Sequence, residues 1–196
     1  MDEREDHGLR LHELHRWLID LARETVRRAL DGEGLVLPDP AKVPELAALP
    51  GATFVTLRRD GSLLGCVGSM EPRRSLADDV ASNAYSAAFL DPRLPAVTAD
   101  DWSHMTTEVS LLGSLERLDV SSRAELLAVL RPRVDGVLVT SAGRRGTFLP
   151  SVWHQVRDGD EFLDLLWEKA GLRVGSWPPD LLVERYQVDE LDDAPT

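Results

Sequence analysis

The amino-acid sequence predicts an α+β fold in which helices flank a mainly antiparallel sheet. β-rich runs at 53–57 and 63–69 enclose an Asp-Gly pair at 60–61, which favours the tight turn of a hairpin. Apolar residues recur with helical periodicity at 9–31 and 76–90. Strands and helices do not alternate regularly along the chain, so the sequence does not indicate the repeated βαβ units of a parallel sheet.

Local signals set the ends of the first two helices. The helix at 9–31 ends at an Asp-Gly pair, and a proline-spaced loop with at most one helical turn at 43–49 follows it. Ser75 is expected to cap the second helix, whose first turn carries two aspartates where the helix dipole favours negative charge. The Asp-Pro-Arg-Leu-Pro run at 91–95 ends that helix.

The second half of the chain is expected to form shorter helices and strands. We expect, in chain order, a strand at 107–118, a short helix at 123–130, a strand at 135–140, a returning strand at 147–149, a helical turn at 150–156, a helix at 159–170 ended by Gly171, and a strand at 181–188. An acidic tail that frays is expected after the last strand. The strands at 53–57, 63–69 and 107–115 are expected to share one sheet.

Composition excludes several classes of protein. The 196 residues include 22 basic and 34 acidic side chains, a net charge of −12 that disfavours binding to nucleic acid or to an anionic membrane surface. No apolar run reaches the length of a membrane helix, and the first residues lack the pattern of a signal peptide. We therefore expect an acidic, cytoplasmic protein that binds neither nucleic acid nor membrane.

The chain has one cysteine, Cys66, which excludes an internal disulfide framework and a multi-cysteine zinc site. It lies in a β-rich run between Gly65 and Gly68, and glycines in a strand often mark close approach of backbone or ligand. One interpretation is an open thiol whose neighbouring backbone N–H groups hold a developing negative charge. The other is a small buried apolar residue, as free cysteine usually is.

Glu108 and two arginine doublets are further candidates. A carboxylate at the start of a strand can hold a substrate amine, or act as a base if burial raises its pKa; a salt bridge of Glu108 to Arg93 or Arg145 is the alternative. The doublet at 73–74 lies beside a helix start, and the doublet at 144–145 lies in a glycine-flanked turn. The two doublets suit either an anion pocket or two solvated turns.

The histidines do not indicate a metal centre. His12 and His15 lie three residues apart on one helix face, which is at most half of a metal site. For His7, His104 and His154 we expect ordinary solvated or hydrogen-bonded side chains.

Four motifs in this order and spacing resemble the AMMECR-one domain family, also labelled AmmeMemoRadiSam system protein A. They are Leu-Gly-Cys-Val-Gly-Ser-Met-Glu-Pro at 64–72, Ser-Ala-Ala-Phe-Leu-Asp-Pro-Arg-Leu-Pro at 86–95, Glu-Val-Ser-Leu-Leu at 108–112, and Gly136 with Gly-Thr-Phe-Leu-Pro-Ser-Val-Trp at 146–153. The resemblance covers nearly the whole chain, from the first helix to the strand at 181–188. The chain departs from the family pattern at Leu64, where a basic residue is usual, and at Val67, where isoleucine is usual.

The resemblance implies one domain over residues 1–196 with two lobes, the smaller around 135–175, and a cleft near the Gly-Cys-Val-Gly motif. It also implies two companions, a Memo-like protein and a radical S-adenosylmethionine protein, but no reaction. Two classes of function remain open. The first is a component of that modification system with Cys66 as nucleophile or covalent carrier and Glu108 as base or orienting group. The second is a non-catalytic module that binds a small molecule or protein, with Cys66 structural.

We expect the site to assemble from segments far apart in the sequence. The motif at 64–72, the helix end at 91–95, Glu108 and the turn at 144–150 are expected to converge on one cleft, because functional residues gather on rigidly supported loops. The residues expected to contact a small-molecule ligand there are Gly65, Gly68, Arg93, Arg145 and Thr147.

Overall fold

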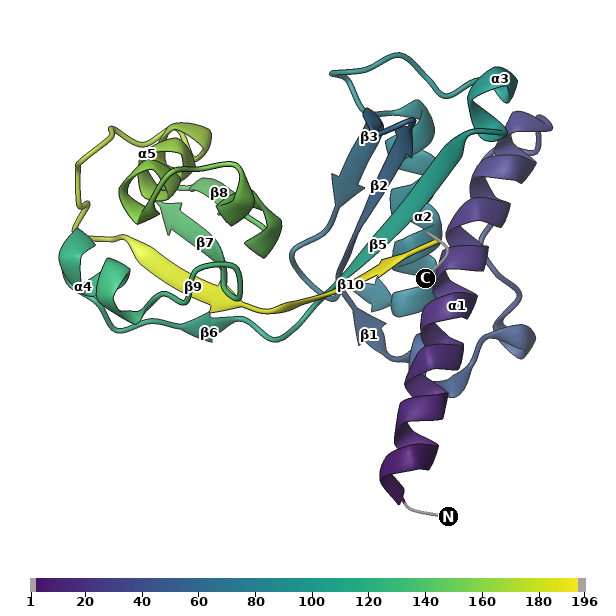
Figure 1. Ribbon diagram of the computed structural model, residues 1–196, viewed down its shortest axis with the longest axis horizontal. Helices are drawn as coiled ribbons and strands as arrows, with labels where there is room; N and C mark the ends of the chain where they lie inside the picture. The colour runs from purple at the N-terminus through teal and green to yellow at the C-terminus, as the bar shows by residue number, and fades with distance from the viewer. Residues whose placement is uncertain (1–2, 194–196) are drawn as a thin grey trace. The chain divides into compact units, whose positions relative to one another are not determined.

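The structure, a computed structural model, describes the backbone of residues 3–193 and the side chains of residues 12–193 (Figure 1). The His7 side chain and residues 194–196 of the expected tail lie outside this range. The chain forms two compact units, one of Met1–Leu112 with Asp189–Thr196 and one of Gly113–Val188. Helices combine with antiparallel sheets, so the predicted α+β class is confirmed.

The first unit contains α1 (Glu3–Leu30), η1 (Pro40–Lys42), η2 (Glu45–Ala48), β1 (Pro50–Gly51), β2 (Thr53–Arg59), β3 (Ser62–Gly68), β4 (Arg74–Ser75), α2 (Leu76–Phe89), α3 (Ala99–Trp102), β5 (Met105–Leu112) and β10 (Val188–Asp192). The second contains β6 (Glu116–Arg117), α4 (Arg123–Val129), β7 (Gly136–Ser141), β8 (Arg144–Phe148), η3 (Pro150–His154), α5 (Gly159–Lys169) and β9 (Leu182–Tyr186). Among the described residues, no helix is both long and apolar enough to cross a membrane.

The main sheet of the first unit has the strand order β10-β5-β2-β3 (Figure 1). The three strands expected to share a sheet are therefore confirmed as neighbours. Val55, Leu57 and Val109 are fully buried in the core that α1 and α2 complete. Because side chains alternate across a strand, residues 54, 56 and 58 of β2 point to the opposite face of the sheet.

Helix α2 lies very close to the sheet. Ser75 caps it, as predicted, by accepting a hydrogen bond from the Asp78 amide at 3.1 Å. Its buried face is built largely from alanines, which lets the helix backbone approach β3. A Cβ atom added at Gly65 would lie 1.8 Å from the Ala87 carbonyl oxygen, so only glycine fits at that position.

A buried carboxylate ties α2 to the start of β2. Asp79 has no exposed surface and accepts hydrogen bonds from the Thr53 amide and hydroxyl, both at 2.8 Å. Asn83 donates to it at 2.9 Å, Ser69 at 2.7 Å and Arg74 at 3.0 Å. This network joins α2, the start of β2 and the segment after β3, and so fixes the sheet against the helix.

The second unit folds around its own four-stranded sheet, in the order β6-β9-β7-β8. Its core includes Phe162 and Trp167 of α5, and Trp153 stacks on Phe162 with ring centroids 3.9 Å apart. Helix α5 begins after an Asp158 cap and ends at Gly171, which has a φ of +68°. The helices expected at 123–130 and 159–170 are thus confirmed within a residue.

Three expectations about strands are wrong. Arg144 and Arg145 do not lie in a turn, because β8 begins at Arg144 and both residues pair with β7. The run at 107–118 is not one strand, because β5 ends at Leu112 and β6 begins at Glu116 in the sheet of the other unit. The acidic segment after 188 is not a frayed tail up to 193, because β10 at 188–192 pairs with β5 and buries Leu191. Only one of its five side chains, that of Leu191, is buried, so the sequence lacks the apolar alternation of an ordinary strand.

Candidate functional site

Cys66, Thr56 and Glu108 form one row across the sheet of the first unit. Thr56 on β2 pairs with Cys66 on β3 and with Glu108 on β5. The row lies on the face that α1 and α2 do not cover. Two strand spacings, about 10 Å, separate the Cα atoms of Cys66 and Glu108. The Thr56 hydroxyl donates a hydrogen bond to the Cys66 sulfur at 3.3 Å, and Cys66 is partly exposed.

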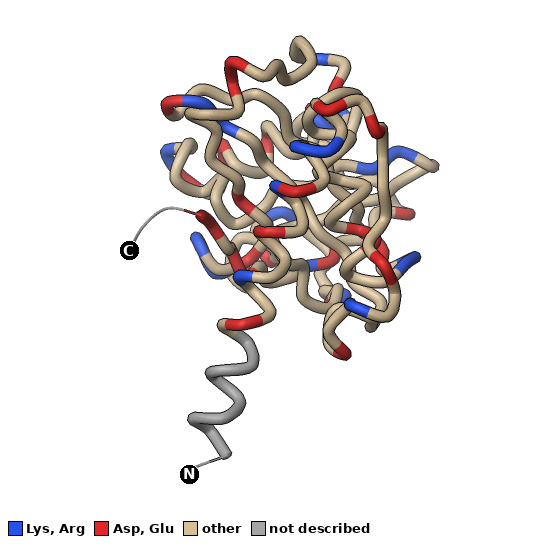
Figure 2. The backbone as a smooth tube through the Cα atoms, turned by 90° about the vertical axis from the view of Figure 1, so that its right-hand side faces the viewer, with Lys and Arg blue, Asp and Glu red and all other residues tan. Residues whose placement is uncertain are grey.

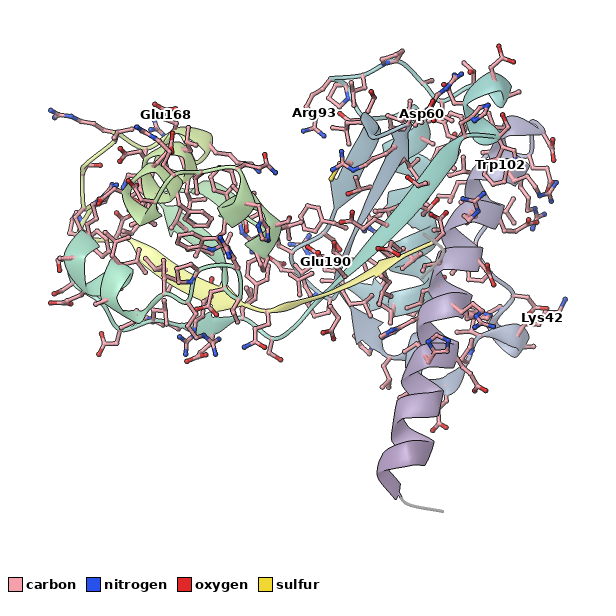
Figure 3. All side chains as sticks on the ribbon, viewed as in Figure 1. Lys42, Asp60, Arg93, Trp102, Glu168 and Glu190 are labelled. Atoms are coloured by element: carbon pink, nitrogen blue, oxygen red, sulfur yellow. The ribbon has the colours of Figure 1, made fainter. Side chains whose placement is uncertain are left out.

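Asp91 and Arg93 hold the backbone of Cys66 on the edge strand β3. Figure 3 labels Arg93 beside the sheet of the first unit. The Cys66 amide donates to Asp91 Oδ2 at 3.1 Å, and Arg93 Nη2 donates to the Cys66 carbonyl oxygen at 2.9 Å. The two side chains also form an ion pair with two bonds, of 2.8 and 2.6 Å. Hydrogen bonds from Arg93 and from the two backbone amides hold the pKa of Asp91 well below its usual range.

We expect Asp91→Asn to lower the free energy of unfolding by about 2 kcal/mol at neutral pH, because the charged acceptor is lost. The depressed pKa means that this contribution is complete above the ordinary aspartate value of 3.8 and is lost as the pH falls toward the folded-state value. Urea unfolding of both proteins at pH 7 and pH 3 measures it, and the difference should shrink in acid. A difference that stays constant would contradict a stabilising role of the ionised carboxylate.

Gly65 and Gly68 each have a packing reason. Gly65 makes room for α2 on one face, and a Cβ atom at Gly68 would lie 2.2 Å from the Phe54 ring on the other. In an antiparallel ladder the N–H groups alternate in direction, so the Gly65 amide points to β2 while that of Gly68 points away from it. The Cys66 amide itself is occupied by Asp91. Of the two glycines, only Gly68 therefore directs its N–H group away from β2, toward the open edge of the sheet.

Glu108 is half-buried and makes no ion pair within 4 Å among the described residues. Burial raises its pKa, and so does the charge of Glu190, while the Arg58 guanidinium opposes the shift. The alternative salt bridge to Arg93 is wrong, because that guanidinium is bonded to Asp91. Glu108 is thus a carboxyl group that holds its proton to higher pH than an exposed glutamate.

Arg145 and Thr147 lie on β8 of the second unit. The Thr147 hydroxyl bonds to the Val137 carbonyl oxygen at 2.9 Å and to the Tyr186 hydroxyl at 2.6 Å, and burial raises the pKa of Tyr186 to about 12. Arg145 is exposed and pairs with Thr140 in the ladder. The convergence of these two residues with Cys66, and the cleft, stay predictions.

The other arginines of the two doublets have partners within their own units. Arg73 bonds to Glu71 at 2.7 Å and Arg74 to Asp79 at 3.0 Å, while Arg144 donates to the Gly171 carbonyl oxygen. Figure 2 shows basic positions scattered among acidic ones along the described backbone. In residues 12–193, no group of three His, Cys, Asp or Glu side chains is placed to hold a metal ion.

The family model described as AMMECR1 matches residues 19–191. The chain belongs to the AMMECR1 family. The resemblance inferred from the four motifs is thereby confirmed, and the match spans both units of this AMMECR1 protein.

Relatives of this AMMECR1 chain match over most of its length. A protein of Methanothermobacter thermautotrophicus is 38% identical over 177 residues, which cover 88% of this chain and 90% of that protein. A protein of Thermotoga maritima is 32% identical over 181 residues, 91% of this chain and 96% of that protein. The crystal structure of the uncharacterized protein PH0010 from Pyrococcus horikoshii has a TM-score of 0.83 and 27% identity, and it covers 91% of this chain and 90% of that one.

Sequence reasoning missed three residues that shape the site of this AMMECR1 protein. Asp91 lies in the 91–95 segment expected at the cleft but is not among the expected contact residues, although an aspartate two residues before an arginine suits an ion pair. In the sequence, Thr56 is only one residue of a predicted strand. The register of the sheet places it between Cys66 and Glu108. Glu190 belongs to the segment expected to fray, so no local signal pointed to it.

Proposed function

We propose that this AMMECR1 protein handles a small-molecule substrate through Cys66, as nucleophile or covalent carrier, within a modification system. Its companions in that system are a Memo-like protein and a radical S-adenosylmethionine protein. The observation that carries the chemical part is the row of Cys66, Thr56 and Glu108 on the sheet face away from α1 and α2. A thiol, a hydroxyl bonded to it and a protonatable carboxyl group are the components of a covalent thiol site.

The roles follow from the positions in the row. The Thr56 hydroxyl stabilises negative charge on the Cys66 sulfur through its hydrogen bond of 3.3 Å. Glu108 lies two strands from the thiol, so it acts on the far part of a bound substrate rather than on the sulfur. Because burial raises its pKa, it holds a proton to higher pH than an exposed glutamate and can donate that proton to the substrate and take it back.

A second candidate is a binding module in which Cys66 is structural. The occupied amide of Cys66 favours it, because one donor beside the sulfur is unavailable to a substrate oxyanion. The packing roles of Gly65 and Gly68 favour it as well, since these glycines are needed whether or not a ligand binds. The reactivity of the thiol separates the two candidates.

We expect folded Cys66 to be alkylated by iodoacetamide, and Thr56→Val to lower the second-order rate constant about fivefold, because the hydrogen bond to the attacking sulfur is lost. Intact mass spectrometry reads the product directly, since the chain has a single cysteine. Thr106→Val, an exposed threonine on the same face of β5, is the matched control and should react as the wild type does. A folded protein that resists alkylation, while the urea-unfolded chain reacts, would assign Cys66 to the structural role.

The partner part of the proposal is tested by association. We expect the purified protein to bind the Memo-like or the radical S-adenosylmethionine protein at micromolar concentration in a pull-down, and to shift no DNA in a gel at about 50 mM salt, where electrostatic binding is strong. The net charge of −12 supports the second expectation. Association with neither companion, or tight DNA binding, would overturn this part.

A further inference from the structure

The sheet face that carries Cys66 is acidic at its β5–β10 side. Leu191 of β10 points into the core, so Glu190 and Asp192 point to the same face as Glu108. The charges of Glu190 and Asp192 raise the pKa of Glu108, and the Arg58 guanidinium opposes them. Glu108 and Glu190 have no ion-pair partner within 4 Å among residues 12–193. Two carboxylates without an ion-pair partner within 4 Å, from strands about 80 residues apart, therefore lie on this face, and one of them, Glu108, belongs to the row.

A buried hydroxyl lies next to these carboxylates. Ser110 follows Glu108 by two residues on β5, so its side chain is on the same face, opposite Phe54 in the ladder. It has no exposed surface, and its oxygen has no hydrogen-bond partner within 3.5 Å in the described part of the chain, although the hydroxyl is close enough to Glu108 to lower the pKa of that carboxyl group. Buried hydroxyl groups are almost always bonded in folded proteins, so an unpaired one beside a carboxylate indicates a position for an outside donor.

We propose that the substrate of the Cys66 site carries a cationic amine, which Glu108 and Glu190 bind through their carboxylates while the Ser110 hydroxyl accepts one of its N–H groups. An ammonium group presents three donors and a positive charge, which matches two carboxylates and one hydroxyl oxygen. The inference rests on the proposed role of Cys66. The row places the ammonium at one end of the substrate and the carbon that reacts with the thiol at the other.

Three methanethiosulfonate reagents with the same reactive group and different charge test the inference: 2-aminoethyl, 2-hydroxyethyl and 2-sulfonatoethyl. In each case the Cys66 thiolate attacks the sulfenyl sulfur, a disulfide bond forms, the thiol proton goes to solvent, and methanesulfinate leaves with the electron pair. Each rate is divided by the rate of the same reagent with the urea-unfolded chain, which removes intrinsic differences. We expect the cationic reagent to exceed the anionic one about tenfold in folded wild-type protein.

Variants assign the preference to the two glutamates. At an ionic strength of about 0.01 M, where the screening length is about 30 Å, Glu108→Gln should lower the cation-to-anion ratio about threefold. Glu190→Gln should lower the ratio by a smaller factor, because β10 lies one strand farther from the thiol than β5. Glu45→Gln is the matched control, since Glu45 is exposed on η2, which packs on the helices of the other face. Glu190 is exposed, so its replacement tests the inference even if Glu108→Gln is poorly folded.

The outcomes distinguish this inference from the proposed function. A ratio equal to that of the unfolded chain, or one that both glutamine variants leave unchanged, overturns the cationic substrate while the reactive thiol stands. A folded protein that reacts with none of the three reagents overturns the proposed function instead.

Discussion

Replacing Gly65 by alanine is expected to lower the free energy of unfolding by about 3 kcal/mol or more, or to prevent folding of the first unit. The added Cβ atom would lie 1.8 Å from the Ala87 carbonyl oxygen and 2.7 Å from its carbonyl carbon. Both are backbone atoms of α2, so no side-chain rotation relieves the clash, and the helix and the strand must separate. Urea unfolding followed by circular dichroism measures the loss.

Gly61→Ala is the control for the general cost of replacing a glycine in this hairpin. Gly61 has a φ of +80°, and a Cβ atom there meets nothing within 4 Å. Its replacement should cost about 1 kcal/mol, the ordinary penalty of a left-handed conformation. If Gly65→Ala costs no more than Gly61→Ala, then α2 does not require the close approach to β3 that the structure shows.

Replacing Asp79 by alanine is the second change with a large expected effect, a loss of about 3 to 5 kcal/mol in the free energy of unfolding. The carboxylate accepts bonds from Thr53, Ser69, Arg74 and Asn83 in a site with no solvent exposure. Its removal leaves buried donors unpaired and a guanidinium without its partner, and both carry a desolvation cost. Thermal and urea unfolding measure the change.

Asp78→Ala tests whether the effect belongs to the network or to the helix dipole. Asp78 is also in the first turn of α2, so its replacement removes the same favourable charge at the helix start, which is worth less than about 1 kcal/mol. Equal losses for the two variants would show that the hydrogen bonds of Asp79 add nothing beyond the dipole.

Periodicity and turn residues predict much of this fold, and their failures have physical causes. The hairpin at 53–68 and the capped helix after Ser75 depend on local backbone preferences, which a single sequence displays. β10 depends on pairing with β5, a partner about 80 residues away, and on one buried side chain, Leu191. Local pattern cannot reveal a strand that only a distant neighbour stabilises.

The candidate site was also only partly predictable from the sequence. Cys66 and Glu108 stand out by residue type, but their placement on one row follows from the register of three strands, which no spacing in the sequence fixes. The glycines beside Cys66 suggest an open thiol, whereas their contacts are with Ala87 and Phe54. A glycine in a strand indicates that another group approaches the backbone closely, and only the structure shows whether that group belongs to a ligand or to the protein itself.

The order of strands in the chain has a consequence for biosynthesis. β10 begins where the second unit, Gly113–Val188, ends, yet it completes the sheet that β2, β3 and β5 begin. During translation the outer edge of β5 therefore stays unpaired until the last segment leaves the ribosome, and an unpaired strand edge is a template for wrong association. Glu190 arrives with that segment, so the acidic side of the Cys66 face is the last part of the site to form.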